Sequence, residues 1–316
     1  MRILVLGAGA VGGYLGGRLA ASGAVEEVAF VVRPNRRAAL DRDGLVIESP
    51  HAGDLRQPVT ALLPGDVRPG WDVVLFACKA YDLADAIETI RPAVDGRSAV
   101  LPILNGLSHI DVLVQAFGEE RVLGGLAGIQ ATLTAEGVVR HLAPLTFITF
   151  GELAGPVSPR VAALKAAFDR THVTATASTD IRGAMWSKLV FLGTLAAATV
   201  LMRANLGEIA AAPGGAAWLE RLLSRSAEIA AAHGHPVPPS QLEGYATFFR
   251  SSHAATASML RDLEGGGRIE ADHILGYLLE AARRAGVPDA LHEAAFLNAK
   301  AYEARRAAGR LPMAGS

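Results

Sequence analysis

The 316-residue sequence has little cysteine, few aromatic side chains and almost no net charge. A single cysteine excludes an intramolecular disulfide and fits a reducing cytoplasm. Thirty Lys and Arg residues balance 31 Asp and Glu residues, so no basic field points to nucleic acid. The apolar run at residues 189–202 is shorter than the roughly 20 residues that span a bilayer, and residues 3–6 lack the flanks of a signal peptide. We therefore expect a cytoplasmic protein with no nucleic-acid or membrane partner.

Several site signatures are also missing. No G-x-S-x-G and no P-loop lysine occurs, which argues against hydrolases and kinases. The nine histidines show no zinc-like spacing, and His233-x-His235 is more typical of a turn, so we expect no metal. Lysine is scarce: only four of the 30 basic residues are lysine, at Lys79, Lys165, Lys188 and Lys300. Because arginine does not release a proton near neutral pH, a lysine inside a motif is more informative here than usual.

The apolar pattern predicts two different domains, as the length of the chain allows. In the first half, short apolar runs alternate with helical patterns, which is typical of a parallel sheet covered on both faces. Strands are expected at residues 2–6, 27–32, 45–48, 71–77 and 98–104. Residues 138–140 and 146–150, separated by residues 141–145 with Pro144, are expected to form a hairpin that closes the same sheet. From about residue 180 the pattern predicts helices at residues 181–202, 217–232, 241–249, 270–285 and 289–308.

The first expected strand runs directly into a complete G-x-G-x-x-G, Gly7-Ala8-Gly9-Ala10-Val11-Gly12. In this pattern the first glycine permits a tight turn, the second lets a pyrophosphate approach the backbone, and the third lets the helix pack on the strand. The helix N-terminus offers free N–H groups and a partial positive charge to phosphates. A purely structural glycine turn is the alternative. The strand before it and the small-residue helix after it favour a dinucleotide site of Gly7, Gly9, Ala10, Val11 and Gly12. We therefore expect an α/β Rossmann domain at residues 1–175, with a mostly parallel sheet, and an all-α domain at residues 176–316.

The residue that follows the second expected strand indicates which dinucleotide binds. A 2′-hydroxyl is usually bound by an acidic side chain about 20 positions past the glycines. Arg33 stands there, Arg36 and Arg37 follow, and no Asp or Glu lies between residues 28 and 40. Guanidinium groups suit a 2′-phosphate through charge-assisted hydrogen bonds. A solvated basic loop is the simpler alternative, but NADP(H) is the predicted cofactor.

Together these residues resemble the ketopantoate reductases (2-dehydropantoate 2-reductases) over nearly the whole chain. The resemblance lies in the order and spacing of GAGAVG, Cys78-Lys79, Asn105-Gly106, Trp186-Ser187-Lys188-Leu189, Ser258-Met259-Leu260-Arg261-Asp262 and Ile269-Glu270. It implies NADPH-dependent reduction of a 2-oxo acid in a cleft between a Rossmann domain and a helical domain. For ketopantoate itself it implies a role in pantothenate biosynthesis. A homodimer through the helical domain is expected by the same resemblance.

The resemblance also implies roles for individual residues. Lys188 matches the catalytic lysine and Glu270 its carboxylate partner. Ser258 matches a residue that helps to hold the substrate carboxylate. Asn105 matches the asparagine beside the nicotinamide and the substrate, and Lys79 a lysine near the cofactor.

The residues themselves allow this chemistry and also simpler interpretations. Reducing a ketone requires a hydride donor and a proton for the oxygen. Lys188 can donate the proton and polarise the carbonyl, and Glu270 favours its charged form. Alternatively, Lys188 is a surface lysine, Glu270 an acid favoured by a helix N-terminus, and Asn105 a turn residue. Lys79 has the same alternative as Asn105, and Ser258 alone is an ordinary helix serine.

The sequence departs from the family pattern beside the lysine. Members that reduce ketopantoate commonly carry asparagines one and two turns after it, where this chain has Leu192 and Ala196. Because residues four apart share a helix face, this stripe predicts a 2-oxo acid with an apolar or bulkier side chain. Two other functions stay open: a 3-hydroxy acid dehydrogenase, against which Leu192 counts, and a non-catalytic regulator that senses NADP.

Overall fold

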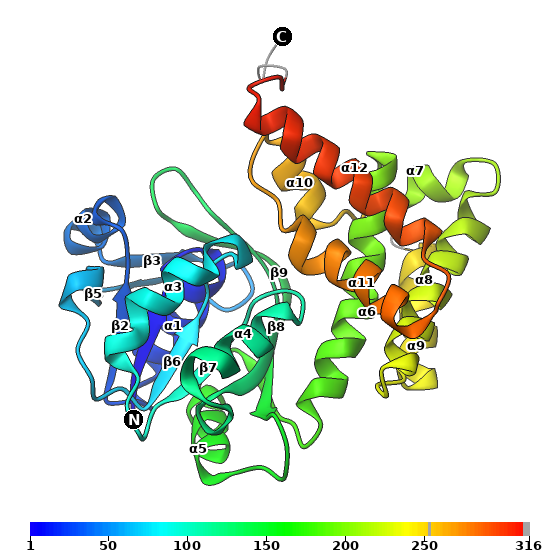
Figure 1. Cartoon of the computed structure of the whole chain (residues 1–316). Helices are drawn as coiled ribbons and strands as arrows, with labels where there is room; N and C mark the ends of the chain where they lie inside the picture. Colours follow the sequence, from blue (N-terminus) through cyan, green and yellow to red (C-terminus); the bar gives the residue numbers. More distant parts are fainter. Residues whose placement is uncertain (252–253, 312–316) are drawn as a thin grey trace. The chain divides into compact units, whose positions relative to one another are not determined.

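A computed structural model describes residues 1–251 and 254–311 (Figure 1). The chain forms two compact units. The α/β unit comprises Met1–Leu104 and His109–Ile181, and the helical unit comprises Asn105–Ser108 and the chain from Arg182 onward. An N-terminal parallel α/β domain followed by a largely helical region confirms the predicted fold class.

The α/β unit is built on a parallel sheet of the order β5-β2-β1-β6-β7. Its strands are β1 (Arg2–Leu6), β2 (Glu27–Val31), β5 (Thr60–Leu62), β6 (Val73–Phe76) and β7 (Ala99–Pro102). β6 is apolar and wholly buried, and β1 is apolar and buried after Arg2, because helices cover both faces of the sheet. The helices of this half are α1 (Ala10–Ser22), α2 (Pro34–Asp43), α3 (Leu83–Ile90), α4 (Ser108–Phe117) and α5 (Pro159–Phe168), with short turns at Pro64–Asp66, Ala80–Asp82, Arg91–Ala93 and Glu119–Arg121.

The third expected strand belongs to a different sheet, which corrects the predicted topology. β3 (Leu45–Glu48) lies in a second sheet, where it pairs antiparallel with β4 (Leu55–Gln57) and parallel with β9 (Val139–Glu152). Its burial alternates along the strand, as in a strand with one covered face. The edge position beside β2 is taken by β5, whose three residues carry too weak a pattern to be recognised.

The expected hairpin is also corrected. β9 runs without interruption through Pro144, and its antiparallel partner is β8 (Leu123–Leu133). The chain reverses at residues 134–138, where Thr134 N donates to Val138 O and Gly137 has a φ of 86°. Between the pairs Ile129–Thr146 and Ala131–His141 the register shifts. The extra residues of β9 accommodate Pro144, which has no N–H to donate to a ladder. The hairpin belongs to the second sheet, together with β10 (Thr174–Ala177).

The helical unit contains every helix predicted for the second half. These are α6 (Ile181–Met202), α8 (Gly215–Ala232), α9 (Pro239–Ser251), α11 (Tyr277–Ala285) and α12 (Ala290–Ala307). The structure adds two short helices, α7 (Leu206–Ala211) and α10 (Ser258–Glu264), and a π turn at Asp272–Gly276 before α11. α11 packs against α8 and α12 (Figure 1). Of the described helices, α6 alone is long and apolar enough to cross a membrane, but 67% of its apolar window is buried, as in the core helix of a soluble protein.

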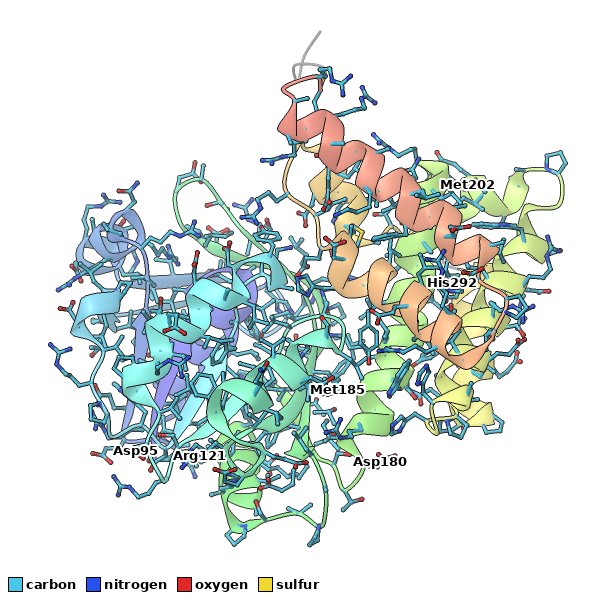
Figure 2. All side chains as sticks on the ribbon, in the orientation of Figure 1. Asp95, Arg121, Asp180, Met185, Met202 and His292 are labelled. Atoms are coloured by element: carbon cyan, nitrogen blue, oxygen red, sulfur yellow. The ribbon has the colours of Figure 1, made fainter. Side chains whose placement is uncertain are left out.

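A buried polar chain connects three helices of this unit. His292 of α12, labelled in Figure 2, is 1% exposed, and its Nε2 lies 3.0 Å from Ser226 Oγ of α8. Thr194 of α6 donates to Ser226 Oγ at 2.9 Å. Burial lowers the pKa of His292 to about 4, so this histidine is neutral in the folded core near neutral pH.

Candidate functional site

The glycine-rich turn has a different geometry at each glycine. Gly7 follows β1 with a φ of 100°, which favours glycine. Gly9 caps α1, and nothing lies within 4 Å of the position that its Cβ would take. A Cβ on Gly12 would collide with the carbonyl oxygen of Gly7 and lie 2.6 Å from the Cβ of Ala77. The turn is therefore tight at Gly7, open at Gly9 and fully packed at Gly12, while Ala10 and Val11 begin the helix.

The sheet brings other predicted residues to the same edge. β2 and β6 flank β1 in parallel, so the ends of all three strands meet there. The connection after β1 leads to β2 and the connection after β6 leads to β7, in opposite directions along the sheet. Arg33 follows β2, and Lys79 follows β6 with an exposed side chain. Ligands of open α/β sheets bind at such an edge. An open Gly9, a helix N-terminus and two exposed cations together fit a phosphate-bearing dinucleotide.

The three arginines of the basic segment have different environments. Arg33 is 86% exposed and forms an ion pair with Asp82 at 3.2 Å. Arg36 donates from Nε to the carbonyl oxygen of Ala8 at 3.1 Å and from Nη1 to that of Gly137 at 2.6 Å. Arg37 pairs with Asp66 at 2.9 Å. Arg33 is thus the most accessible to a ligand, and Arg36 supports the backbone of the glycine-rich turn.

Two of these contacts were not anticipated from the sequence. Asp82 lies 49 positions after Arg33. The sequence around Arg33 contains no acidic residue, so it gave no indication of this partner. The contact between Arg36 and Ala8 depends on how α2 packs beside the turn, and no local pattern encodes it.

The helical unit holds the second group of predicted residues. Lys188 lies in the second turn of α6 and donates from Nζ to Asn105 Oδ1 at 3.1 Å. Asn105 belongs to the helical unit although it follows the last strand of the parallel sheet. Glu270 immediately precedes the single helical residue Ala271, which leads into the π turn, and its side chain is buried at 6% exposure. The structure therefore brings Asn105 to Lys188 across 83 positions of sequence.

The environment of Lys188 changes its acidity. Burial lowers the pKa of the Lys188 ammonium from 10.5 to about 8, while the negative charge of Glu270 acts in the opposite direction. Lys188 is therefore protonated in most molecules at pH 7, yet it releases its proton far more readily than an exposed lysine. A group with this pKa is suited to donate a proton near neutral pH.

The remaining predicted residues also lie in the helical unit. Leu192 is half-buried and Ala196 is 2% exposed, both on the unbroken helix α6. Ser258 is the exposed first residue of α10. The start of α10 contacts α6, because Ala257 N donates to Thr199 Oγ1 at 3.3 Å. Their contacts with a substrate stay a prediction.

The His233-x-His235 pair has a packing role. Both rings stack on Trp186 of α6, at centroid distances of 5.2 and 6.0 Å. Within residues 1–251 and 254–311, no group of three or more His, Cys, Asp and Glu side chains is arranged to hold a metal ion.

Comparison with known proteins assigns the class. The model of the ketopantoate reductase PanE/ApbA family matches residues 3–155, and that of its C-terminal region matches residues 180–303. The chain belongs to the ketopantoate reductase PanE/ApbA family of oxidoreductases. A curated relative, the uncharacterized oxidoreductase YkpB of Bacillus subtilis (strain 168), is 35% identical over 97% of this chain and 100% of its own length.

Solved structures share the architecture over the full length. The 2-dehydropantoate 2-reductase from Methylococcus capsulatus is 29% identical with a TM-score of 0.86, covering 97% of this chain and 98% of its own. A D-mandelate dehydrogenase solved with NADH and anilino(oxo)acetate has a TM-score of 0.85 at 20% identity, covering 97% of this chain and 100% of its own, which shows the shared fold.

Proposed function

We propose that the protein is an NADPH-dependent reductase that converts a 2-oxo acid into a 2-hydroxy acid. The observation that carries the proposal is the Lys188–Asn105 pair, in which a half-buried lysine with a pKa of about 8 is oriented by an amide oxygen. Membership of an oxidoreductase family supports it.

The helical unit supplies the proton of this reaction. The Lys188 ammonium polarises the ketone and donates a proton to its oxygen as that oxygen becomes an alkoxide. Asn105 accepts one Lys188 N–H and so limits the directions in which the other two point. Glu270 favours the charged form of the lysine. After the transfer, the neutral amine recovers a proton from solvent.

The α/β unit holds the cofactor in this proposal. NADPH, when bound, supplies the hydride. The pyrophosphate would bind at the start of α1, where backbone N–H groups donate hydrogen bonds to it. The residues of this site are Gly7, Gly9, Ala10, Val11 and Gly12. Arg33 binds the 2′-phosphate, and Lys79 provides a second positive charge at the same edge.

We place the substrate among 2-oxo acids with an apolar or bulky side chain. Leu192 follows Lys188 by one helical turn and offers no hydrogen bond. A substrate hydroxyl buried against it would lose its hydrogen bonds, at a cost of roughly 1–3 kcal/mol. Ketopantoate carries such a hydroxyl, so it should be a poorer substrate than a branched or aromatic 2-oxo acid. Ser258 is proposed to help hold the carboxylate that all of these substrates share.

The deciding experiment is steady-state NADPH oxidation with ketopantoate and with branched and aromatic 2-oxo acids, with the 2-hydroxy product identified. A higher kcat/KM for the apolar acids supports the proposal. A clearly higher kcat/KM for ketopantoate would contradict the proposed substrate class and indicate a role in pantothenate biosynthesis. Leu192→Asn should shift preference toward ketopantoate, whereas Leu192→Met, which stays apolar, should not. NADPH binding without any turnover would favour a regulator. Oxidation of 3-hydroxy acids alone would favour a 3-hydroxy acid dehydrogenase.

We further propose a cytoplasmic location and a homodimer formed through the helical unit. The single cysteine of the sequence fits a reducing compartment. Light scattering on the purified protein tests the dimer, because a mass near 32.9 kDa would identify a monomer.

A further inference from the structure

The segment Asn105–Ser108 is attached to the helical unit at three points. Asn105 accepts from Lys188 at 3.1 Å. Ser108 Oγ shares a hydrogen bond with His273 Nδ1 at 2.9 Å. Gly106 has a φ of 86°, and a Cβ there would collide with the carbonyl oxygen of His273. The hydrogen bond of Ser108 and the close backbone approach of Gly106 therefore both involve the same residue, His273.

His273 lies in the π turn Asp272–Gly276, which begins two residues after Glu270. π turns are rare and frequently occur at functional sites. Residues 270–276 thus carry both Glu270, whose charge acts on Lys188, and His273, which contacts the segment that contains Asn105. Neither His273 nor Ser108 was among the residues predicted from the sequence.

We propose that His273 is a positioning residue, which acts through Ser108 and Gly106 to hold Asn105 on Lys188 and to keep water away from the lysine. Because Asn105, Lys188 and His273 belong to one compact unit, the arrangement does not depend on where the α/β unit lies. The effect on turnover rests on the proposed reductase function, whereas the effect on the titration of Lys188 does not.

Loss of the His273–Ser108 bond should change the acidity of Lys188. Burial is the largest cause of its lowered pKa. A released segment admits water, so the pKa should rise toward that of an exposed lysine. Lysine scarcity makes this measurable, since protein grown on lysine labelled with carbon-13 at the ε position has four lysine signals. Lys188→Arg identifies the signal of Lys188.

The test compares the parent protein with Ser108→Ala and His273→Ala. In both variants the Lys188 signal should titrate at least about 0.5 pH units higher, while the other three lysine signals stay in place. His273→Asn keeps a hydrogen-bonding atom near the position of Nδ1 and should restore the parent titration. An unmoved or lowered Lys188 pKa in both alanine variants would overturn the proposal.

Kinetics provide a second readout. With an accepted 2-oxo acid, each alanine variant should lower kcat about five- to tenfold and leave the KM for NADPH unchanged. The double variant should lose no more than either single variant, because both remove the same bond. Additive losses would show that the two residues act separately. If the parent protein reduces no 2-oxo acid but its Lys188 titration responds as expected, the reductase proposal fails and the positioning role stands.

Glycine substitutions separate steric release from backbone strain. Gly106→Ala adds a methyl group against the His273 carbonyl, and it should raise the Lys188 pKa as the other variants do. The matched control is Gly214→Ala, because Gly214 has a similar φ of 80° in the same unit and nothing within 4 Å of its Cβ position. The control should leave the Lys188 titration and kcat unchanged. An equal response of the two variants would attribute the effect to general strain and contradict the proposal.

Discussion

The two units carry candidate sites of opposite physical character. The edge of the α/β unit presents backbone groups, an open position at Gly9 and the exposed cations of Arg33 and Lys79. The helical unit holds a half-buried cation, Lys188, whose charged form is favoured by Glu270, a carboxylate that is 6% exposed. An exposed cation keeps its proton and suits a phosphate, whereas a desolvated ammonium gives its proton up more easily. The edge of the α/β unit is therefore suited to bind a phosphate-bearing ligand, and the Lys188 site of the helical unit is suited to exchange a proton.

The largest expected effect comes from removing the proton donor. Lys188→Ala should lower kcat about a hundredfold or more, the usual range for general acid catalysis. NADPH affinity should hardly change, because Lys188 is proposed to act on the substrate and not on the cofactor. Lys165→Ala, at an exposed lysine paired with Asp169, is the matched control and should keep the parent kcat. A near-normal kcat in Lys188→Ala would remove this lysine from the mechanism.

Two glycines of one turn should separate stability from binding. Gly12→Ala forces a methyl group against Gly7 and Ala77, and overpacking of this kind costs about 1–3 kcal/mol. Gly9→Ala meets open space, so its thermal midpoint should stay close to that of the parent while its NADPH affinity falls about tenfold or more. Calorimetry and a fluorescence titration measure the two quantities. Unchanged NADPH affinity in Gly9→Ala would argue that the phosphates do not approach this position.

The pH dependence should report the charge held in the helical unit. Because Lys188 must be protonated to act and its pKa is about 8, kcat/KM should be level below pH 8 and fall about tenfold per pH unit above it. The residual activity of Lys188→Arg should lack this break, since arginine keeps its proton. A break that persists in Lys188→Arg belongs to another group.

The smallest effects concern cofactor choice. NADPH should bind at least about tenfold more tightly than NADH, a difference of about 1.4 kcal/mol, and Arg33→Asp should narrow or reverse the gap. Asp82→Asn removes the partner with which a 2′-phosphate must compete. Because exposed ion pairs are weak, this change should strengthen NADPH binding only about two- to fivefold. Equal affinities for the two nucleotides in the parent protein would contradict the role of Arg33.

Elements with a strong local pattern were predictable. The bounds of β1, β3 and α6 agree with the expected ranges, because each apolar run ends at a glycine, a turn or a change of period. β8 was missed because three of its first six residues are glycines and its second half is half-exposed or exposed, so no strand pattern is visible. β3 was assigned to the wrong sheet, because pairing partners depend on contacts that a four-residue run does not encode.

The candidate sites divide in the same way. The glycine-rich turn was predictable because its six residues are contiguous and each has a stated geometric task. Lys188, Asn105 and Glu270 lie too far apart in sequence for spacing to join them, and only the family resemblance placed them together. Arg36, Asp82 and His273 carry no local signal, because their contacts depend on how distant elements pack.

The path of the chain constrains how such a protein can be inherited. The backbone passes between the units three times, after Leu104, Ser108 and Ile181. A recombination event that transferred residues 182–316 to another α/β domain would carry Lys188 and leave its amide partner behind. The recipient would need a matching asparagine in the same short excursion of its own chain. Exchange of either half would therefore preserve the Lys188–Asn105 bond only if the four residues 105–108 were matched in the new chain.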